Sequence, residues 1–202
     1  MSRRVNLREI TDKLFIISEG KKTERKYFGN YRKRGCGLEI STPNTSKTDP
    51  VGLVKYAERQ IRKNELEPDG DDEVWCVFDV DQNEENIKQA VDKAEDNDIK
   101  IALSNPCFEL WFLLHFELRQ TKLSCEDTID NLKKYLPDYS KNQDIFYEIV
   151  DERDKAISHA KKLNEIHEKQ RNNELYSPES NPSTQVFKLV EYILDHTECA
   201  EE

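Results

Sequence analysis

The hydrophobic positions of this chain fall into short continuous runs, separated by longer charged segments in which apolar residues recur every three or four positions. Short runs rich in Val, Ile, Leu and aromatic residues are typical of strands buried on both faces of a sheet. We predict such strands at residues 14–17, 38–40, 73–79 and 99–103. The spacing in the charged segments predicts amphipathic helices at residues 21–34, 51–64 and 82–97. Residues 107–116 are nearly all apolar and follow Pro106, which favours a buried helix.

From residue 117 onward the pattern changes to helices without obvious strands. We predict these helices near residues 125–136, 143–148, 151–171 and 184–196, with Ser183 or Thr184 capping the last one. Strands alternating with helices, followed by helices alone, predict an open and mostly parallel α/β sheet of about four strands flanked by helices. We therefore expect an α/β core in residues 1–116 and a helical extension in residues 117–202 that packs on this core.

Two acidic residues, Asp79 and Asp81, follow the most apolar of the predicted strands. In a parallel sheet, ligands bind beyond the carboxyl ends of the strands. Alternation along an extended backbone places these two carboxylates on the same side of the chain. Carboxylate oxygens are the ligands that a hard cation such as Mg²⁺ prefers. The alternative is structural, because an Asp-x-Asp sequence after a strand also forms turns and helix caps.

Two further acids occupy related positions. Glu19 lies in a Ser-Glu-Gly corner after the first predicted strand, and Glu109 lies in the first turn of the apolar helix that follows a later strand. If these acids converge on Asp79 and Asp81, their mutual repulsion is a reason to expect a bound cation. Glu109 can instead be a first-turn acid that the helix dipole stabilises.

The charge balance narrows the range of partners. The chain carries 31 Lys and Arg against 41 Asp and Glu, a net charge of −10, so any contact with nucleic acid must come from a local basic patch. Residues 21–34 form such a patch, with seven basic residues and one acid. Lys21, Lys22, Arg25 and Lys26 are the candidates for holding a nucleic-acid backbone, with Tyr27 and Tyr31 available for stacking. The alternative is a solvated helix face.

Cysteine usage and hydropathy indicate the cellular compartment. The five cysteines are scattered, with no CxxC pair and no zinc-type Cys/His spacing, which is typical of reduced cysteines in a cytosolic protein. No signal peptide is evident and no apolar run approaches the roughly 20 residues of a membrane helix. We expect a soluble, cytoplasmic protein without a membrane partner.

Four ordered blocks carry a resemblance to a known family: residues 18–24 (SEGKKTE), 78–81 (FDVD), 104–111 (SNPCFELW) and 181–184 (NPST). Together they resemble the RloB family, which occurs in bacterial and archaeal restriction and phage-defence loci, often near an ATPase. The Glu-Gly and Asp-x-Asp blocks also resemble the Toprim fold of primases, topoisomerases, and OLD-family and RNase M5-like nucleases. The resemblance covers nearly the whole chain.

The resemblance implies a site and an activity. Glu19 matches the Toprim glutamate, Asp79 and Asp81 match its metal-binding aspartates, and Glu109 matches a further acid that helps to hold a second metal. It therefore implies a Mg²⁺-dependent nuclease of DNA or RNA, with one or two ions and with Mn²⁺ as a substitute, acting as an effector of phage defence. Glu19 would serve either as a metal ligand or as the general base.

Two other functions compete with the nuclease. The first is a non-catalytic metal-binding partner of a defence ATPase, which would dock on the charged C-terminal helices. The second is nucleotidyl transfer of the primase kind, which the absence of a zinc-binding motif disfavours.

Overall fold

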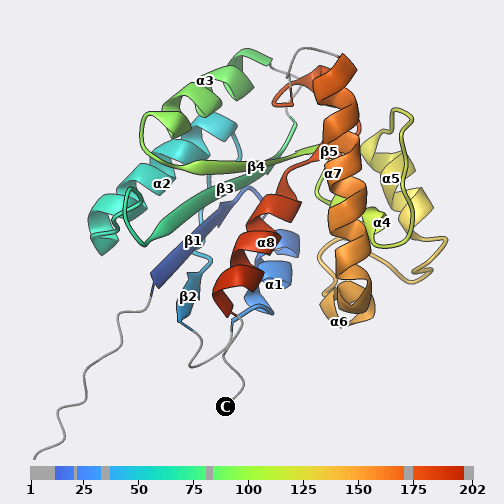
Figure 1. The fold of residues 1–202 in the computed structure, drawn as a ribbon, viewed down its shortest axis with the longest axis horizontal. Helices are drawn as coiled ribbons and strands as arrows, with labels where there is room; N and C mark the ends of the chain where they lie inside the picture. Colours follow the sequence, from blue (N-terminus) through green and yellow to red (C-terminus); the bar gives the residue numbers. More distant parts are fainter. Residues whose placement is uncertain (1–11, 21, 33–36, 81–83, 171–174, 198–202) are drawn as a thin grey trace, which may run out of the picture.

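The computed structural model describes residues 12–20, 22–32, 37–80, 84–170 and 175–197 (Figure 1). A five-stranded sheet with the order β2-β1-β3-β4-β5 forms its centre. The strands are β1 (Asp12–Ser18), β2 (Leu38–Ser41), β3 (Glu73–Asp79), β4 (Lys100–Asn105) and β5 (Ser183–Thr184). The first four are parallel and β5 is antiparallel to β4, so the predicted open, mostly parallel α/β sheet is confirmed with one additional edge strand.

Helices cover both faces of the sheet, and their positions agree with those predicted from apolar spacing. They are α1 (Thr23–Gly29), α2 (Pro50–Asn64), α3 (Glu84–Glu95), α4 (Glu109–Leu114), α5 (Cys125–Leu132), α6 (Phe146–Ile149), α7 (Arg153–Gln170) and α8 (Val186–Thr197). The Asp49 carboxylate caps α2 by accepting a hydrogen bond from the Gly52 amide at 2.7 Å, and Pro50 begins the helix. In the described part of the chain, no helix is long and apolar enough to cross a membrane.

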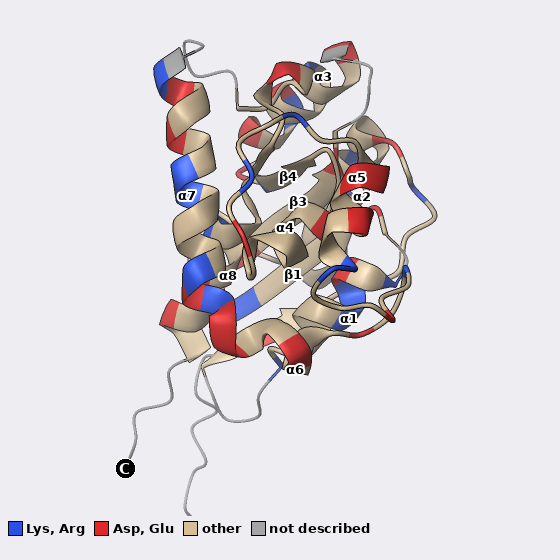
Figure 2. Ribbon diagram, turned by 90° about the vertical axis from the view of Figure 1, so that its right-hand side faces the viewer, with Lys and Arg blue, Asp and Glu red and all other residues tan. Residues whose placement is uncertain are grey.

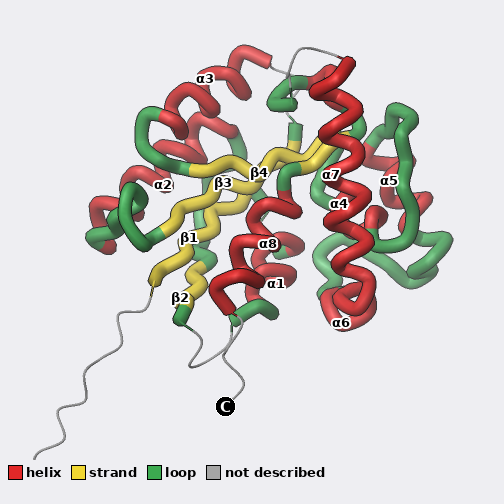
Figure 3. Tube along the Cα trace, in the orientation of Figure 1, coloured by secondary structure: helices red, strands yellow, loops and turns green. Residues whose placement is uncertain are grey.

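Alternate side chains of the strands enter two separate cores. Phe15 and Ile17 of β1 pack with α2 and α3, whereas Leu14 and Ile16 pack on the opposite face with aromatic residues of α1 and α4. Figure 3 shows α2 and α3 on one side of the sheet and α1, α8 and α7 on the other. Burial on both faces explains why these strands are continuous apolar runs.

The C-terminal half of the chain completes both the sheet and one of the cores. Ser104 and Thr184 share a buried hydrogen bond of 2.9 Å between their hydroxyl groups where β4 and β5 pair. The buried Asn105 amide donates to the carbonyls of Ser177 and Pro178, each at 3.1 Å. Leu163 of α7 lies in the same hydrophobic core as residues of α1 and α4.

The cap predicted for the last helix is wrong in part. Ser183 and Thr184 form strand β5, although Thr184 Oγ1 also accepts a hydrogen bond from the Val186 amide at the start of α8. A strand of two residues has no hydrophobic period, so the pattern carries no signal for it.

The exposed side of α7 is strongly charged. Acidic and basic residues are interspersed along it (Figure 2), and Lys161 forms an ion pair of 2.5 Å with Glu191 of α8. Exposed pairs of this kind contribute little to stability. The outer face of this helix is therefore solvated, and its apolar stripe packs in the core.

Candidate acidic site

The register of the sheet aligns the carboxyl ends of β1, β3 and β4. Ser18 pairs with Val77, and Asp79 pairs with Ser104. Beyond the strands, the Glu19 amide donates to the Val77 carbonyl at 3.0 Å and the Val80 amide donates to the Ser104 carbonyl at 2.8 Å. Glu19 and Asp79 therefore emerge at the same edge of the sheet, where ligands of parallel α/β folds bind.

Four acids interact electrostatically at this edge: Glu19, Glu24, Asp79 and Glu109. The pKa of Asp79 is raised well above its usual value, first by burial and then by the carboxylates of Glu24, Glu109 and Glu19. Each deprotonated acid thus makes it harder for the next to lose its proton. The sequence prediction that Glu19, Asp79 and Glu109 come together is in line with this coupling.

The group also contains Glu24, which the sequence reasoning missed. It lies in the first turn of α1 with only 6% of its surface exposed. Burial, followed by the charges of Glu109 and Glu19, raises the pKa of Glu24 to about 7. Its Oε2 atom is buried and has no hydrogen-bond partner among the described residues. A buried acceptor of this kind is costly unless something that is bound there satisfies it.

Glu109 begins α4 and is 4% exposed. The hydroxyl group of Tyr139, which precedes α6 in the chain, donates to Glu109 Oε1 at 3.3 Å. Tyr139 is itself buried. The helical second half of the chain thus helps to fix a carboxylate that the first half provides.

Two of the predicted site residues, Asp81 and Lys21, lie outside the described residues. Among the residues that the structure describes, no three His, Cys, Asp or Glu side chains are placed to hold one metal ion together. The donor chemistry nevertheless fits a hard cation, because the site offers carboxylate oxygens and one of them, Glu24 Oε2, is buried without a partner.

The basic residues of α1 have different surroundings from one another. Lys22 is exposed at the start of the helix. Arg25 donates from Nε to the Thr42 carbonyl at 3.1 Å and from its guanidinium to the Asn44 side chain, and Lys26 donates to the Asn142 carbonyl at 2.6 Å. Arg25 and Lys26 therefore tie α1 to neighbouring loops, while Lys22 is open to solvent.

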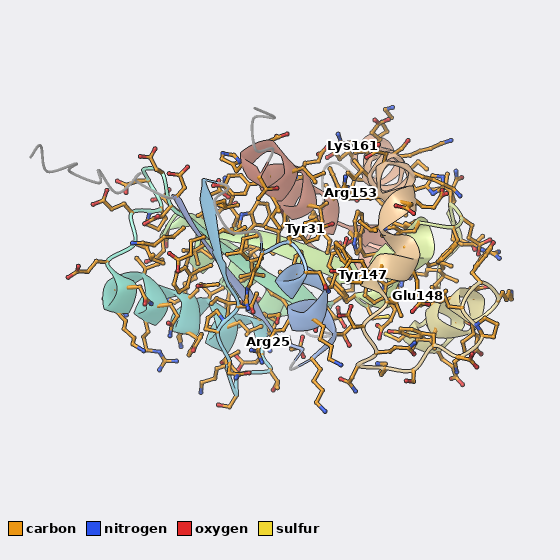
Figure 4. All side chains as sticks on the ribbon, turned by 90° about the horizontal axis from the view of Figure 1, so that it is seen from below. Arg25, Tyr31, Tyr147, Glu148, Arg153 and Lys161 are labelled. Carbon is orange, nitrogen blue, oxygen red and sulfur yellow. The ribbon has the colours of Figure 1, made fainter. Side chains whose placement is uncertain are left out.

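The expectation that Tyr27 and Tyr31 stack on bases is wrong. They are 2% and 5% exposed, and their hydroxyl groups lie 3.0 Å apart. Both rings pack in an aromatic cluster with Phe146, and Tyr31 lies on the side of α1 that faces Arg153 at the start of α7 (Figure 4). Residues 24, 27, 28 and 31 follow the i, i+3, i+4, i+7 spacing of one helix face, and this spacing already marks Glu24 as inward-facing.

Two thiols and a lysine border the acids. Cys125 is exposed at the start of α5, and its Sγ donates to the Pro106 carbonyl at 3.4 Å. A hydrogen bond from the Cys107 thiol, assisted by the charge of Lys141, lowers the pKa of Cys125 to about 7. The pKa of Lys141 is raised, chiefly by the carboxylate of Glu109. Sequence reasoning assigned no role to Lys141.

Comparisons with known proteins agree with the sequence resemblance. A family model described as RloB-like protein matches residues 14–193. No curated protein and no solved structure matches the chain. The matched region includes strands β2 to β5, residues 14–18 of β1 and all four acids described above.

Proposed function

Since the chain belongs to the RloB-like protein family, we propose that it is a Mg²⁺-dependent nuclease that hydrolyses phosphodiester bonds of DNA or RNA. The observation that supports this proposal best is the electrostatic coupling of four carboxylates at the carboxyl edge of the sheet. A cluster of acids of which two, Glu24 and Glu109, are buried and two are half-buried is unfavourable by itself and is typical of a site that binds a divalent cation.

The residues that would hold the cation are Glu19, Asp79 and Glu109, together with Glu24 and the sequence-predicted Asp81. When bound, Mg²⁺ would supply positive charge to the attacking and leaving oxygens of the phosphodiester, and Mn²⁺ would substitute for it. Tyr139 supports this role of Glu109 by fixing one of its oxygens.

The proton of the attacking water requires a base within the same group. A carboxylate with a pKa near the working pH accepts a proton most effectively, and the pKa of Glu24 is about 7. Glu24 therefore joins Glu19 as a candidate general base. Lys22, which is exposed two residues before Glu24, is suited to bind the substrate backbone.

The cellular role that we propose is that of an effector in bacterial or archaeal phage defence or restriction, working in the cytoplasm beside an ATPase partner. The exposed charged face of α7 is the surface that we assign to that partner. The family resemblance supports this setting.

The direct test incubates the purified protein with plasmid DNA, single-stranded DNA and tRNA, in the presence of Mg²⁺ or Mn²⁺. We expect cleavage by the wild type and its loss in Asp79→Asn. Glu39→Gln is the matched control, because Glu39 is an exposed acid on β2. Failure of the wild type to cleave any substrate with either metal would overturn the proposal, as would equal cleavage by Asp79→Asn. Metal binding without cleavage would instead favour the non-catalytic partner of an ATPase.

A further inference from the structure

A short segment of the helical half of the chain, residues 139–142, crosses beside the acidic site and is anchored at both ends. At one end, the buried Tyr139 donates to Glu109 at 3.3 Å. At the other, the Asn142 amide donates to Thr23 Oγ1 at 3.3 Å, and the Asn142 carbonyl accepts from Lys26 at 2.6 Å. These contacts place the segment against both α4 and the first turn of α1.

The backbone of this segment is held in a tight turn. Asn142 has a φ of 72°, in the left-handed region that Asn adopts more readily than most residues. Lys141 lies between the two anchors, so its Cα position is fixed although its side chain is exposed.

The position of residues 139–142 beside α4 and α1 brings the charge of Lys141 close enough to interact with the acids. The pKa of its ammonium group is raised first by Glu109 and, among smaller contributions, by Asp79. The same ammonium counteracts part of the rise in the pKa of Glu24. Lys141 is therefore within electrostatic range of three of the four carboxylates, and it remains protonated at neutral pH.

We propose that Lys141 is a catalytic residue of this site, which binds the scissile phosphate and stabilises the negative charge that develops on it. This inference rests on the proposed nuclease function. In the hydrolysis, the water oxygen bonds to phosphorus and the water proton passes to a carboxylate. The bond from phosphorus to the leaving oxygen breaks, and this oxygen keeps the bonding electron pair and takes a proton from solvent water. Lys141 donates hydrogen bonds throughout and transfers no proton.

The charge balance of the site explains why such a cation is needed. The carboxylates of the site would offset the charge of the divalent ions that they would hold, so the phosphodiester and its transition state would meet little net positive charge. A tethered ammonium at the edge of the site adds a positive charge near the position that the phosphate would occupy. Because it is exposed, the side chain can move to the substrate without loss of packing.

The test compares Lys141→Met and Lys141→Arg with Lys133→Met, a control that removes an exposed lysine at the end of α5. We expect single-turnover cleavage to fall at least 100-fold in Lys141→Met and to recover in part in Lys141→Arg. Mn²⁺ affinity without nucleic acid, measured by titration calorimetry, should be unchanged or tighter in Lys141→Met, because an ammonium that repels the ion has been removed. Unchanged cleavage, or a joint loss of cleavage and Mn²⁺ affinity, would overturn the inference.

A second measurement separates this inference from the nuclease proposal. If the wild type cleaves nothing, the nuclease proposal is overturned. The role of Lys141 in phosphate binding is then tested by measuring how tightly a short fluorescent single-stranded oligonucleotide binds in the presence of Ca²⁺. We then expect Lys141→Met to weaken binding at least tenfold, with Lys133→Met as the reference. Equal binding by Lys141→Met and the wild type would show that the ammonium does not contact phosphate.

Discussion

The carboxylate of Glu24 lies directly against the α-carbon of Gly20. A methyl group placed on Gly20 would overlap both carboxylate oxygens of Glu24. The corner between β1 and α1 therefore leaves room for a carboxylate only because residue 20 has no side chain. This close approach fixes Glu24 beside Glu19, which precedes the glycine.

Substitution Gly20→Ala should consequently displace Glu24 without unfolding the protein. The carboxylate is at the far end of a flexible side chain and can turn away from the added methyl group. We therefore expect the free energy of unfolding to change by about 1 kcal/mol or less. Mn²⁺ affinity should fall at least tenfold. Gly29→Ala is the control, since no atom lies within 4 Å of the added methyl group. Equal Mn²⁺ affinity in both variants would contradict this account.

The raised pKa of Glu24 predicts a pH dependence of stability. This pKa is about 7 in the folded protein, against a usual value of 4.5. Between these values the folded state holds a proton that the unfolded state has released, so the free energy of unfolding falls as pH rises. The loss from Glu24 alone is roughly 3 kcal/mol at most by pH 8.

Urea unfolding in EDTA at pH 5, 6, 7 and 8 measures this slope. Glu24→Gln, which resembles the protonated acid, should remove the part of the slope that comes from Glu24 and should be more stable than the wild type at pH 8. Asp79 acts in the same direction, because its pKa is also raised. Parallel pH profiles for Glu24→Gln and the wild type would show that Glu24 titrates normally.

Divalent cations should stabilise the protein, and more so at high pH. At a concentration one hundred times its Kd, Mn²⁺ would add about 3 kcal/mol to the free energy of unfolding. We expect a rise in Tm of several degrees at pH 8 and a smaller one at pH 5.5, where Glu24 holds a proton that competes with the ion. Asp79→Asn should raise Tm in EDTA and abolish the response to Mn²⁺, whereas Glu39→Gln should behave as the wild type does.

The basic residues at the start of α1 should separate into two classes. Arg25→Ala removes hydrogen bonds to Thr42 and Asn44 and should lower the free energy of unfolding by about 1 kcal/mol. Lys22→Ala should leave Tm unchanged and weaken oligonucleotide binding, with a smaller dependence on salt concentration. Thermal unfolding and fluorescence anisotropy measured on both variants would check this division. A loss of Tm in Lys22→Ala would assign it a structural role as well.

The sequence pattern was sufficient for the four parallel strands and the positions of the helices. Strands such as β3 are buried on both faces, so their apolar runs are unmistakable. Strand β5 has no apolar run, because its two residues form a strand only through pairing with Ser104 and Asn105 of β4.

The site was predictable only in part, for two physical reasons. In the sequence, Glu24 is the single acid of a basic stretch, although its spacing from Tyr27 and Phe28 marks the buried face of α1. Lys141 gives no local signal, since its importance comes from contacts of its neighbours with residues more than 100 positions earlier, such as Thr23. The number of basic residues in a segment gives its charge. It does not show which of these side chains form contacts within the folded protein.

The pairing of β5 with β4 has a consequence for the order in which the protein is made. Ser104 and Thr184, which pair at this edge, are 80 residues apart in the chain. Closing so long a loop is slow, and a chain still on the ribosome lacks Thr184 until 80 further residues have been added after Ser104. Strands β1 and β3, which position Glu19 and Asp79, are thus synthesised long before Asn105 can bind the 177–180 turn. A newly made chain therefore has these acids before it can form the hydrogen bonds that close this edge of the sheet.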